Sequence, residues 1–275
     1  MSTIDELIAT FSPISLEKMD DVTLLNRMDK KFVFNVAKLP VILEQIAPFY
    51  HVLEIGQLRN HHYETLYFDT PGYQLYLNHH NKRLNRFKVR SRRYADSGLV
   101  YFEIKFKNNK GRTIKERNRQ KGPQEEIAGR QEAWLASCTS LTPGMLKPAL
   151  WVSFSRITLV NCGFTERVTL DTGLSFRNEF GEIAYADVAI AEVKQDRSAG
   201  SVIANVLHKE HVLAKKISKY CLGIVSLNHQ IRQNNYKEKL HYINKLNHDI
   251  SEAHYVVPSA IAAGFSGEGS HSAAN

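Results

Sequence analysis

Apolar and charged residues alternate with period two along several segments, and this alternation limits the fold more than any other feature. In VYFEIKFK, 100–107, Phe102, Ile104 and Phe106 share one parity, whereas Glu103, Lys105 and Lys107 share the other. TIKERNR, 113–119, repeats the split. Because successive side chains of a strand point to opposite faces, each segment has an apolar and a charged face. This pattern predicts an antiparallel sheet with one packed face.

Turn signals separate the alternating segments. TPG at 70–72, ADSG at 95–98 and NNKG at 108–111 divide residues 63–119 into strands of an antiparallel meander. A first strand is expected at 27–35, RMDKKFVFN. Three or four more are expected in WVSFSRITLV, ERVTLDTGLSF and EIAYADVAIAEVK. We therefore expect seven to nine strands in total.

Helical spacing appears between and around these strands. Thr3 and Glu6 form a capping box for a short first helix that ends before Pro13. Further helices are expected at 15–25, 36–49, 124–138, 200–211 and 228–247. The whole predicts an α+β fold with a large antiparallel sheet, in one domain over 1–258 with its core at about 27–223. The Gly/Ser-rich tail, 259–275, is predicted to be disordered.

Composition favours an anionic partner. The formal net charge is +8 and the pI is near 9.3, which suits nucleic acid, acidic membrane or phosphorylated small molecules. The three cysteines lack the paired CxxC spacing of zinc and redox sites. No segment reaches the roughly 18 apolar residues of a membrane span. We therefore expect a reduced, soluble, cytoplasmic protein.

The densest positive stretch is RFKVRSRRY, which has five cations in nine residues. On a strand, Lys88, Arg90 and Arg92 point to one side. Like charges on neighbouring strands repel, so a sheet that gathers them on one face needs an anion to offset the cost. Arginine supplies a planar fork that matches phosphate or carboxylate oxygens. The alternative is an ordinary polar face that looks at water, with lysines protecting the sheet edges from aggregation.

Several motifs follow one another between Arg27 and Gly223. They are RMDKKFVF, ETLYFDTPG, KVRSRRY, VYFEIKFK with TIKER, FSRITLV followed by RVTLDTGLSF, AIAEVK, and KKISKYCLG. In order and spacing they resemble the catalytic domain of the vacuolar transporter chaperone (VTC) family, the polyphosphate polymerases of the triphosphate tunnel, or CYTH-like, superfamily. The resemblance implies a closed antiparallel β-barrel, with a tunnel of basic side chains inside and helices packed outside.

The resemblance also implies an activity. Such an enzyme transfers the terminal phosphate of ATP to a growing inorganic polyphosphate chain and releases ADP, with Mn²⁺ or Mg²⁺ on the phosphates. Carried over by motif, the residues expected to be catalytic are Arg90, Arg92, Lys105, Lys115 and Lys219. Those expected to bind phosphate are Lys31, Arg156, Arg167 and Lys216, and Glu192 would hold the metal.

The sequence departs from the superfamily in two places. Hydrolytic and cyclase members begin with an ExExK signature, where this chain has Arg27, Asp29 and Lys31, which favours the polymerase branch. Where VTC domains often read Tyr-Asn-Arg, this chain has Phe154 before Ser155 and Arg156, so it lacks a phenol hydroxyl there.

The sequence also has no room for the SPX domain or membrane region of eukaryotic relatives. Regulation and export would then come from partners, including a membrane protein at the inner face of a membrane. Without an aromatic platform or a helix-turn-helix element, nucleic acid is not expected as a partner. Two other functions stay open, namely hydrolysis of tripolyphosphate or a nucleoside triphosphate, and binding of a polyanion without catalysis.

Single residues have simpler interpretations as well. Glu103 is expected to orient cations rather than bind metal. Glu192 could pair with Lys194 on its own strand. Lys216 and Lys219 would share one face of a helix. Asp69 and Asp171 lie beside predicted turns, so both are expected to make local hydrogen bonds.

Overall fold

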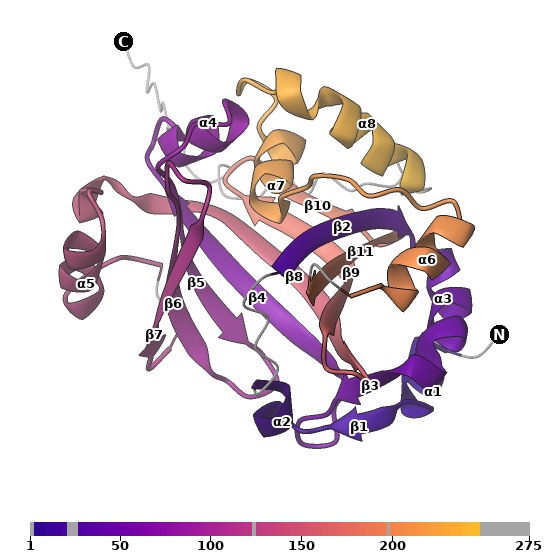
Figure 1. The fold of residues 1–275 in the computed structure, drawn as a ribbon. Coiled ribbons are helices and arrows are strands. Elements are labelled where there is room, and N and C mark those ends of the chain that lie inside the picture. Colours follow the sequence, from indigo (N-terminus) through magenta and orange to yellow (C-terminus); the bar gives the residue numbers. More distant parts are fainter. Residues whose placement is uncertain (1–2, 21–26, 123–124, 197–198, 248–275) are drawn as a thin grey trace, which may run out of the picture.

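The computed structural model describes residues 3–20, 27–122, 125–196 and 199–247 of the 275-residue chain (Figure 1). Within them, a single eleven-stranded sheet has the main strand order β2-β11-β9-β8-β4-β5-β6-β7. The strands are β1 (Ser12–Ile14), β2 (Arg27–Asn35), β3 (Tyr50–Leu53), β4 (Asn60–Asp69), β5 (Arg86–Tyr94), β6 (Val100–Lys107), β7 (Thr113–Gln120), β8 (Lys147–Asn161), β9 (Glu166–Asn178), β10 (Gly181–Tyr185) and β11 (Val188–Asp196). All pairs are antiparallel except β1 with β3. The predicted α+β class with a large antiparallel sheet is confirmed.

Helices cover both faces of the sheet. They are α1 (Ile4–Ala9), α2 (Leu16–Asp20), α3 (Leu39–Ile46), α4 (Gln74–His80), α5 (Arg130–Cys138), α6 (Val202–Lys209), α7 (Lys219–Leu227) and α8 (Lys237–Leu246), with 3-10 turns η1 (Val36–Lys38), η2 (Ala47–Phe49), η3 (Pro143–Met145) and η4 (Asn234–Tyr236). The capping box of Thr3 and Glu6 is confirmed. The helices expected at 124–138 and 228–247 begin later, at Arg130 and Lys237. The expected tail, 259–275, lies outside the described residues.

The predicted closed barrel is not confirmed. In the described residues the main strand order ends at β2 and β7, and no ladder of hydrogen bonds joins them. The outer edge of β2 is instead met by the segment before α7. Phe32 forms an isolated bridge with Ala214, and the Lys215 N–H donates to the Lys31 carbonyl at 2.7 Å. This segment occupies the edge that barrel closure would use.

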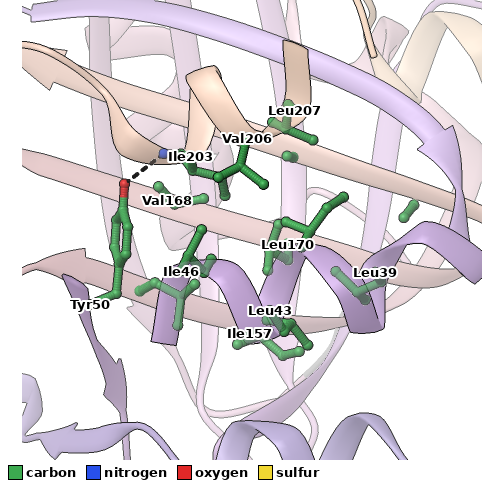
Figure 2. Close-up of a cluster of buried hydrophobic side chains, with 14 of the residues drawn as sticks. Leu39, Leu43, Ile46, Tyr50, Ile157, Val168, Leu170, Ile203, Val206 and Leu207 are labelled. Atoms are coloured by element: carbon green, nitrogen blue, oxygen red, sulfur yellow. Dashed lines mark hydrogen bonds between the residues drawn. The ribbon is translucent and has the colours of Figure 1, made fainter. Parts of the chain in front are cut away.

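One face of the sheet packs against α1, α3 and α6. Figure 2 shows Leu43 and Ile46 of α3 beside Ile157 and Leu170 of the sheet, with Ile203 of α6 nearby. All five side chains are buried, and at roughly 25 cal/mol per Å² of apolar area such burial is the main force that holds the helices here. This face therefore carries one of the two large buried apolar clusters of the protein.

The fixed position of α6 also depends on a buried polar group. The Tyr50 hydroxyl accepts a hydrogen bond from the backbone N–H of Ile203 at 3.1 Å (Figure 2). It donates one to the Glu166 carboxyl. Burial, followed by the charge of Glu166, raises the pKa of the Tyr50 phenol far above its ordinary value. The phenol therefore stays protonated and keeps the start of α6 on the sheet.

The opposite face divides into an apolar end and a charged middle. Helix α7 packs over the apolar end, where Tyr220 and Ile224 contact a cluster that includes Leu150 and Phe176. Gly223 makes this approach close, because a Cβ there would lie 2.5 Å from Phe176 Cδ1. The N-terminus of α7 is thereby held beside the charged middle. In Figure 1, α4, α7 and α8 gather at this end of the sheet.

None of the described helices has the length and apolarity that crossing a membrane requires. The three cysteines, Cys138, Cys162 and Cys221, are free thiols.

Candidate active site

Strand register aligns charged residues across the middle of the sheet. Lys31 of β2 lies opposite Glu192 of β11, and Arg156 of β8 lies opposite Asp171 of β9. Three more pairs lie opposite one another on β5, β6 and β7, namely Arg90 with Glu103, Lys88 with Lys105, and Lys105 with Lys115. All lie on the face opposite the α3 and α6 core. Residues far apart in sequence thus form one charged surface.

Glu103 holds two of these cations. Its carboxylate lies 2.6 Å from Arg90 Nε and 2.5 Å from Lys115 Nζ. The side chain is only 1% exposed. Burial raises the pKa of Glu103, but the charges of Arg90, Arg92 and Lys115 outweigh it and lower the pKa to about 2. Glu103 is therefore an anion at neutral pH that fixes the two cations, as the sequence predicted.

Asp171 forms a second group with Arg156 and Lys219. The Arg156 guanidinium binds it at two points, Nε to Oδ1 at 2.6 Å and Nη2 to Oδ2 at 2.8 Å, and Lys219 Nζ donates to Oδ2. Burial raises the pKa of Asp171, whereas Arg156 and Lys219 outweigh it and lower the pKa to about 2. The expectation that Asp171 makes only local hydrogen bonds is wrong, because it joins β8, β9 and α7.

Glu192 forms the third group. Its oxygens lie 3.0 Å from Lys31 Nζ and 3.3 Å from Lys194 Nζ. The expected pair with Lys194 is therefore present, alongside a second partner. Burial raises the pKa of Glu192, but the two lysines hold it far below its ordinary value. The Glu192 side chain is 23% exposed, so this charged residue is still open to solvent.

Three cations at the centre have no such partner. In the described part of the chain, no carboxylate lies within ion-pair distance of Lys88, Arg92 or Lys105. Arg92 donates to the Thr65 hydroxyl at 3.3 Å and Lys88 to the Ser218 hydroxyl at 2.8 Å. These contacts orient the two charges without neutralising them, which leaves both free to attract a ligand anion.

The pKa of Lys105 also shows how crowded the positive charges are. Burial, followed by the charges of Lys88 and Arg90, lowers the pKa of Lys105 to about 8. Its side chain nonetheless remains accessible to solvent. An anion bound beside Lys105 would relieve this repulsion, so the site is poised for an anionic ligand.

A cavity of about 620 Å³ opens at this surface. Its lining, which we call the basic cavity, includes nine Lys and Arg side chains and one carboxylate among the described residues: Asp29, Lys31, His79, Lys82, Leu84, Arg86, Lys88, Lys105, Lys107, Thr113, Lys215, Lys216, Ile217, Ser218, Tyr236 and Lys239. Ser218 is the N-cap of α7, so the positive end of that helix dipole faces the same space. The arrangement suits a phosphate-rich ligand.

Comparison with known proteins decides the family. The model of the VTC domain matches residues 26–228, most of the chain and nearly all of the sheet. The chain belongs to the VTC domain family. No curated protein matches it.

Solved structures resemble this VTC domain only loosely. HpAC1 from Hippeastrum, described as an adenylyl cyclase with a dominant triphosphatase activity, is 13% identical with a TM-score of 0.47, over 72% of this chain and 96% of that one. Two further structures are a conserved hypothetical protein from Pyrococcus furiosus and PH1012 from Pyrococcus horikoshii. Each is 12% identical with a TM-score of 0.39, and each match covers 70% of this chain and 99% of the other protein. Overlaps of this quality do not bear on function.

Most residues assigned from the VTC motifs lie at the charged middle or in the basic cavity. These are Lys31, Arg90, Arg92, Lys105, Lys115, Arg156, Glu192, Lys216 and Lys219. Arg167 lies opposite Lys194 in the register of β9 and β11, and its guanidinium donates to the Met19 carbonyl of α2. Lys216 and Lys219 do not share a helix face, because α7 begins at Lys219 and Lys216 precedes it.

Two side chains of this site were not among the residues carried over from the VTC motifs. Parity had placed Lys88 in one row with Arg90 and Arg92, and the structure puts it in the lining of the basic cavity. Asp171 gave no such signal, since its role depends on the approach of Lys219 from α7. Phe154, in place of tyrosine, lies under cations: Lys219 Nζ is 4.7 Å and Arg156 Cζ 5.1 Å from its ring centroid.

The fit of a divalent metal to this VTC domain depends on Glu192. Among the residues that the structure describes, no three His, Cys, Asp or Glu side chains gather closely enough to hold an ion. Glu192 is a hard oxygen donor, unprotonated and open to solvent. Mg²⁺ and Mn²⁺ accept one carboxylate when phosphate oxygens and waters complete the shell. The residues therefore fit a metal that arrives with a phosphate ligand.

Proposed function

We propose that this VTC domain is an ATP-dependent polyphosphate polymerase. It would transfer the terminal phosphate of ATP to an inorganic polyphosphate chain and release ADP. The observation that carries the proposal is the convergence of cations from several strands and α7 on one face, where the described part of the chain offers Lys88, Arg92 and Lys105 no carboxylate at ion-pair distance. Membership of the VTC domain family supports a polyphosphate-related enzyme.

The reaction needs no covalent nucleophile. An oxygen of the terminal phosphate of the chain attacks the γ-phosphorus of ATP, a new P–O bond forms, and the bond from that phosphorus to the β–γ bridging oxygen breaks, so that ADP leaves. The protein supplies mainly position and charge. Arg90 and Arg156, fixed by Glu103 and Asp171, would hold phosphate oxygens, and Arg92 would stabilise charge as it develops.

Glu192 would hold Mn²⁺ or Mg²⁺ on the phosphates. When bound, the ion would neutralise phosphate charge and polarise the oxygens. Lys31 and Lys194 now contact both Glu192 oxygens, so one of these lysines would turn to phosphate when the metal binds. This exchange keeps the number of ion pairs of each lysine unchanged.

The proposal extends to the surroundings of the site. A tunnel closed around the substrate would use the segment before α7, which already meets the edge of β2. Three free cysteines and the use of ATP suit the cytoplasm. Export of the product would depend on a membrane protein as partner.

The decisive assay follows three products together. Purified protein is incubated with ATP and Mn²⁺ or Mg²⁺, and long-chain polyphosphate, ADP and free phosphate are measured. ADP that matches polymer growth supports polymerisation. Free phosphate without polymer would instead show a triphosphatase, and no turnover with retained polyphosphate affinity would show a binding protein.

Two variants connect the activity to the site. Arg92→Ala and Glu192→Gln are each expected to abolish turnover while the melting temperature and circular dichroism stay near those of the parent. Near-normal turnover in both would place the active site elsewhere.

A further inference from the structure

The basic cavity extends beyond the residues assigned to catalysis. Among its lining residues, Lys82 comes from the turn between α4 and β5, Lys216 from the segment before α7, and Lys239 from α8. We call these three residues the mouth. Lys239 lies outside residues 26–228, so part of the mouth is not contained in the match to the VTC domain.

We propose that the mouth is a second polyanion-binding site, which holds the distal phosphates of a chain whose terminal phosphate lies near Arg90 and Arg92. The identity of the polyanion, inorganic polyphosphate, rests on the proposed function. The site would let a long chain bind more tightly than a short one, and so keep a growing product on the enzyme between transfers.

Charge repulsion at the mouth supports this site. Burial lowers the pKa of Lys239, and the charges of Lys82 and Lys216 lower it further, so both of these ammonium groups lie within electrostatic reach of Lys239. Asp29 is the sole carboxylate among the described residues of the lining. A polyanion would offset the repulsion.

The backbone holds Lys82 at this place. Its φ of 57° lies in the left-handed region, which Gly or Asn adopts more easily than Lys. Two hydrogen bonds fix the turn: Lys82 N–H to the His79 carbonyl at 3.1 Å, and Arg83 N–H to the Asn78 carbonyl at 2.9 Å. Lys82 therefore adopts a backbone conformation that is unfavourable for lysine. We take this as a sign that its positive charge has a role in the cavity.

The Lys239 side chain is also held in place. Its Nζ lies 4.5 Å from the ring centroid of Tyr236. That ring is itself buried against Tyr76 and His80, with centroid separations of 6.2 Å and 6.1 Å. A cation fixed by an aromatic ring loses little further freedom when an anion binds.

The shape of the lining favours a linear ligand without bases. Cations reach the cavity from β2, β5, β6, α8 and the two connecting segments, so a small anion contacts few of them and an extended one contacts several in succession. Tyr236 is the only Phe, Trp or Tyr in the described lining, and its ring lies beneath Lys239. Binding of single-stranded nucleic acid uses stacking platforms, which this lining does not offer.

The test compares chain lengths in matched variants. Lys82→Asn together with Lys239→Gln removes two charges while Asn tolerates the left-handed backbone. Lys147→Asn with Lys209→Gln is the control, because both lysines are exposed and neither lines the cavity. Affinities for tripolyphosphate and for polyphosphate of several tens of phosphates are measured by calorimetry at one salt concentration, after thermal unfolding confirms that each variant folds.

We expect the mouth variant to bind the long chain about five- to tenfold more weakly, as the loss of two exposed ionic contacts implies. Tripolyphosphate affinity should stay within about twofold, and the control should match the parent for both ligands. Unchanged long-chain affinity, or equal losses for the two ligands, would overturn the proposal. If the double variant does not fold, the affinities of Lys82→Asn alone for long-chain polyphosphate and for tripolyphosphate are compared in the same way.

Failure of this site and failure of the proposed function are distinguishable. The binding assay needs no turnover, so a protein that forms no polymer from ATP could still show the length-dependent loss. Competition with single-stranded RNA of equal charge shows whether the site prefers polyphosphate or nucleic acid. If RNA displaces long polyphosphate more effectively than polyphosphate itself does, the assignment to polyphosphate is wrong.

Discussion

Arg156 and Asp171 form a two-point ion pair between β8 and β9, with Nε–Oδ1 at 2.6 Å and Nη2–Oδ2 at 2.8 Å. The same carboxylate receives Lys219 from the first turn of α7. One buried anion therefore fixes two cations that approach from different elements. This relation lets the protein concentrate positive charge without loss of a defined structure, and it can be tested directly.

Asp171→Asn should destabilise the free protein and strengthen its response to anions. The change leaves Arg156 and Lys219 without their counter-charge, which costs about 2 to 4 kcal/mol of unfolding free energy. Tripolyphosphate should then raise the melting temperature of the variant more than that of the parent. Urea unfolding and thermal shift measure both effects, with Asp5→Asn, an exposed change in α1, as control. Equal ligand shifts in variant and parent would refute the role of Asp171.

Acid should weaken the fold between about pH 4.5 and pH 2. The pKa values of Glu103 and Asp171 are lowered to about 2 in the folded chain, from 4.5 and 3.8. In this window the unfolded chain binds more protons than the folded one. The stability that the two carboxylates provide is therefore complete above their unfolded pKa values and is lost as pH falls, roughly 2 to 3 kcal/mol for each.

Urea unfolding at a series of pH values measures this loss. Glu103→Gln should be less stable at pH 7 and should show a shallower decline with acid. A decline as steep as that of the parent would mean that Glu103 does not contribute.

Anion affinity should fall as pH rises through about 8. Lys105, with a pKa of about 8, loses its positive charge there. Burial raises the pKa of Tyr67, but Arg90, Lys88 and Arg92 outweigh it and lower the pKa to about 8, so the phenol becomes negative in the same range. Both changes remove positive charge from the site, and tripolyphosphate affinity should drop about three- to tenfold between pH 7 and 9.5.

Two variants test whether Lys105 and Tyr67 cause this pH dependence. Lys105→Arg and Tyr67→Phe should each make the pH profile flatter, and the double variant should be flatter than either single variant. If neither substitution alters the profile, these residues do not face the bound anion.

Gly223→Ala should destabilise the protein, although alanine favours helices by about 1 kcal/mol. The added Cβ would lie 2.5 Å from Phe176 Cδ1 and 2.6 Å from Leu150 Cδ2. Both side chains are buried, so we expect a loss of about 1 to 3 kcal/mol and weaker tripolyphosphate binding as Lys219 moves. Chemical denaturation measures the first and calorimetry the second. Gly200→Ala, where a Cβ meets nothing within 4 Å, is the control. A stabilised variant would contradict the close packing of α7.

The sequence predicts the charged face well because period-two alternation is a local property. Arg90 and Arg92 lie where parity places them, and the same holds for Glu103 and Lys105 on β6. Strand existence and the antiparallel arrangement follow from the alternation and the turn signals together. These features depend on neighbours in the chain, which a sequence displays directly.

Features that depend on contacts between distant segments were harder to predict from the sequence. Asp171 acquires its role from Lys219 of α7, and the capture of Arg167 by the Met19 carbonyl depends on where α2 packs. Closure of the sheet was expected from the family, yet Ala214 and Lys215 meet the β2 edge instead. No local sequence pattern predicts these contacts, because each joins segments that only folding brings together.

The most direct test of the charged face uses two neighbours on β5. Arg92 faces the cations of the site, whereas Arg93 points to the other side, is 43% exposed and pairs with Glu64 at 3.2 Å. Tripolyphosphate affinity is measured by calorimetry for Arg92→Ala and Arg93→Ala at one pH and salt concentration. If the cations of this face bind the polyanion, Arg92→Ala weakens binding by about tenfold or more and Arg93→Ala by less than about twofold. Equal losses in the two variants would contradict the account.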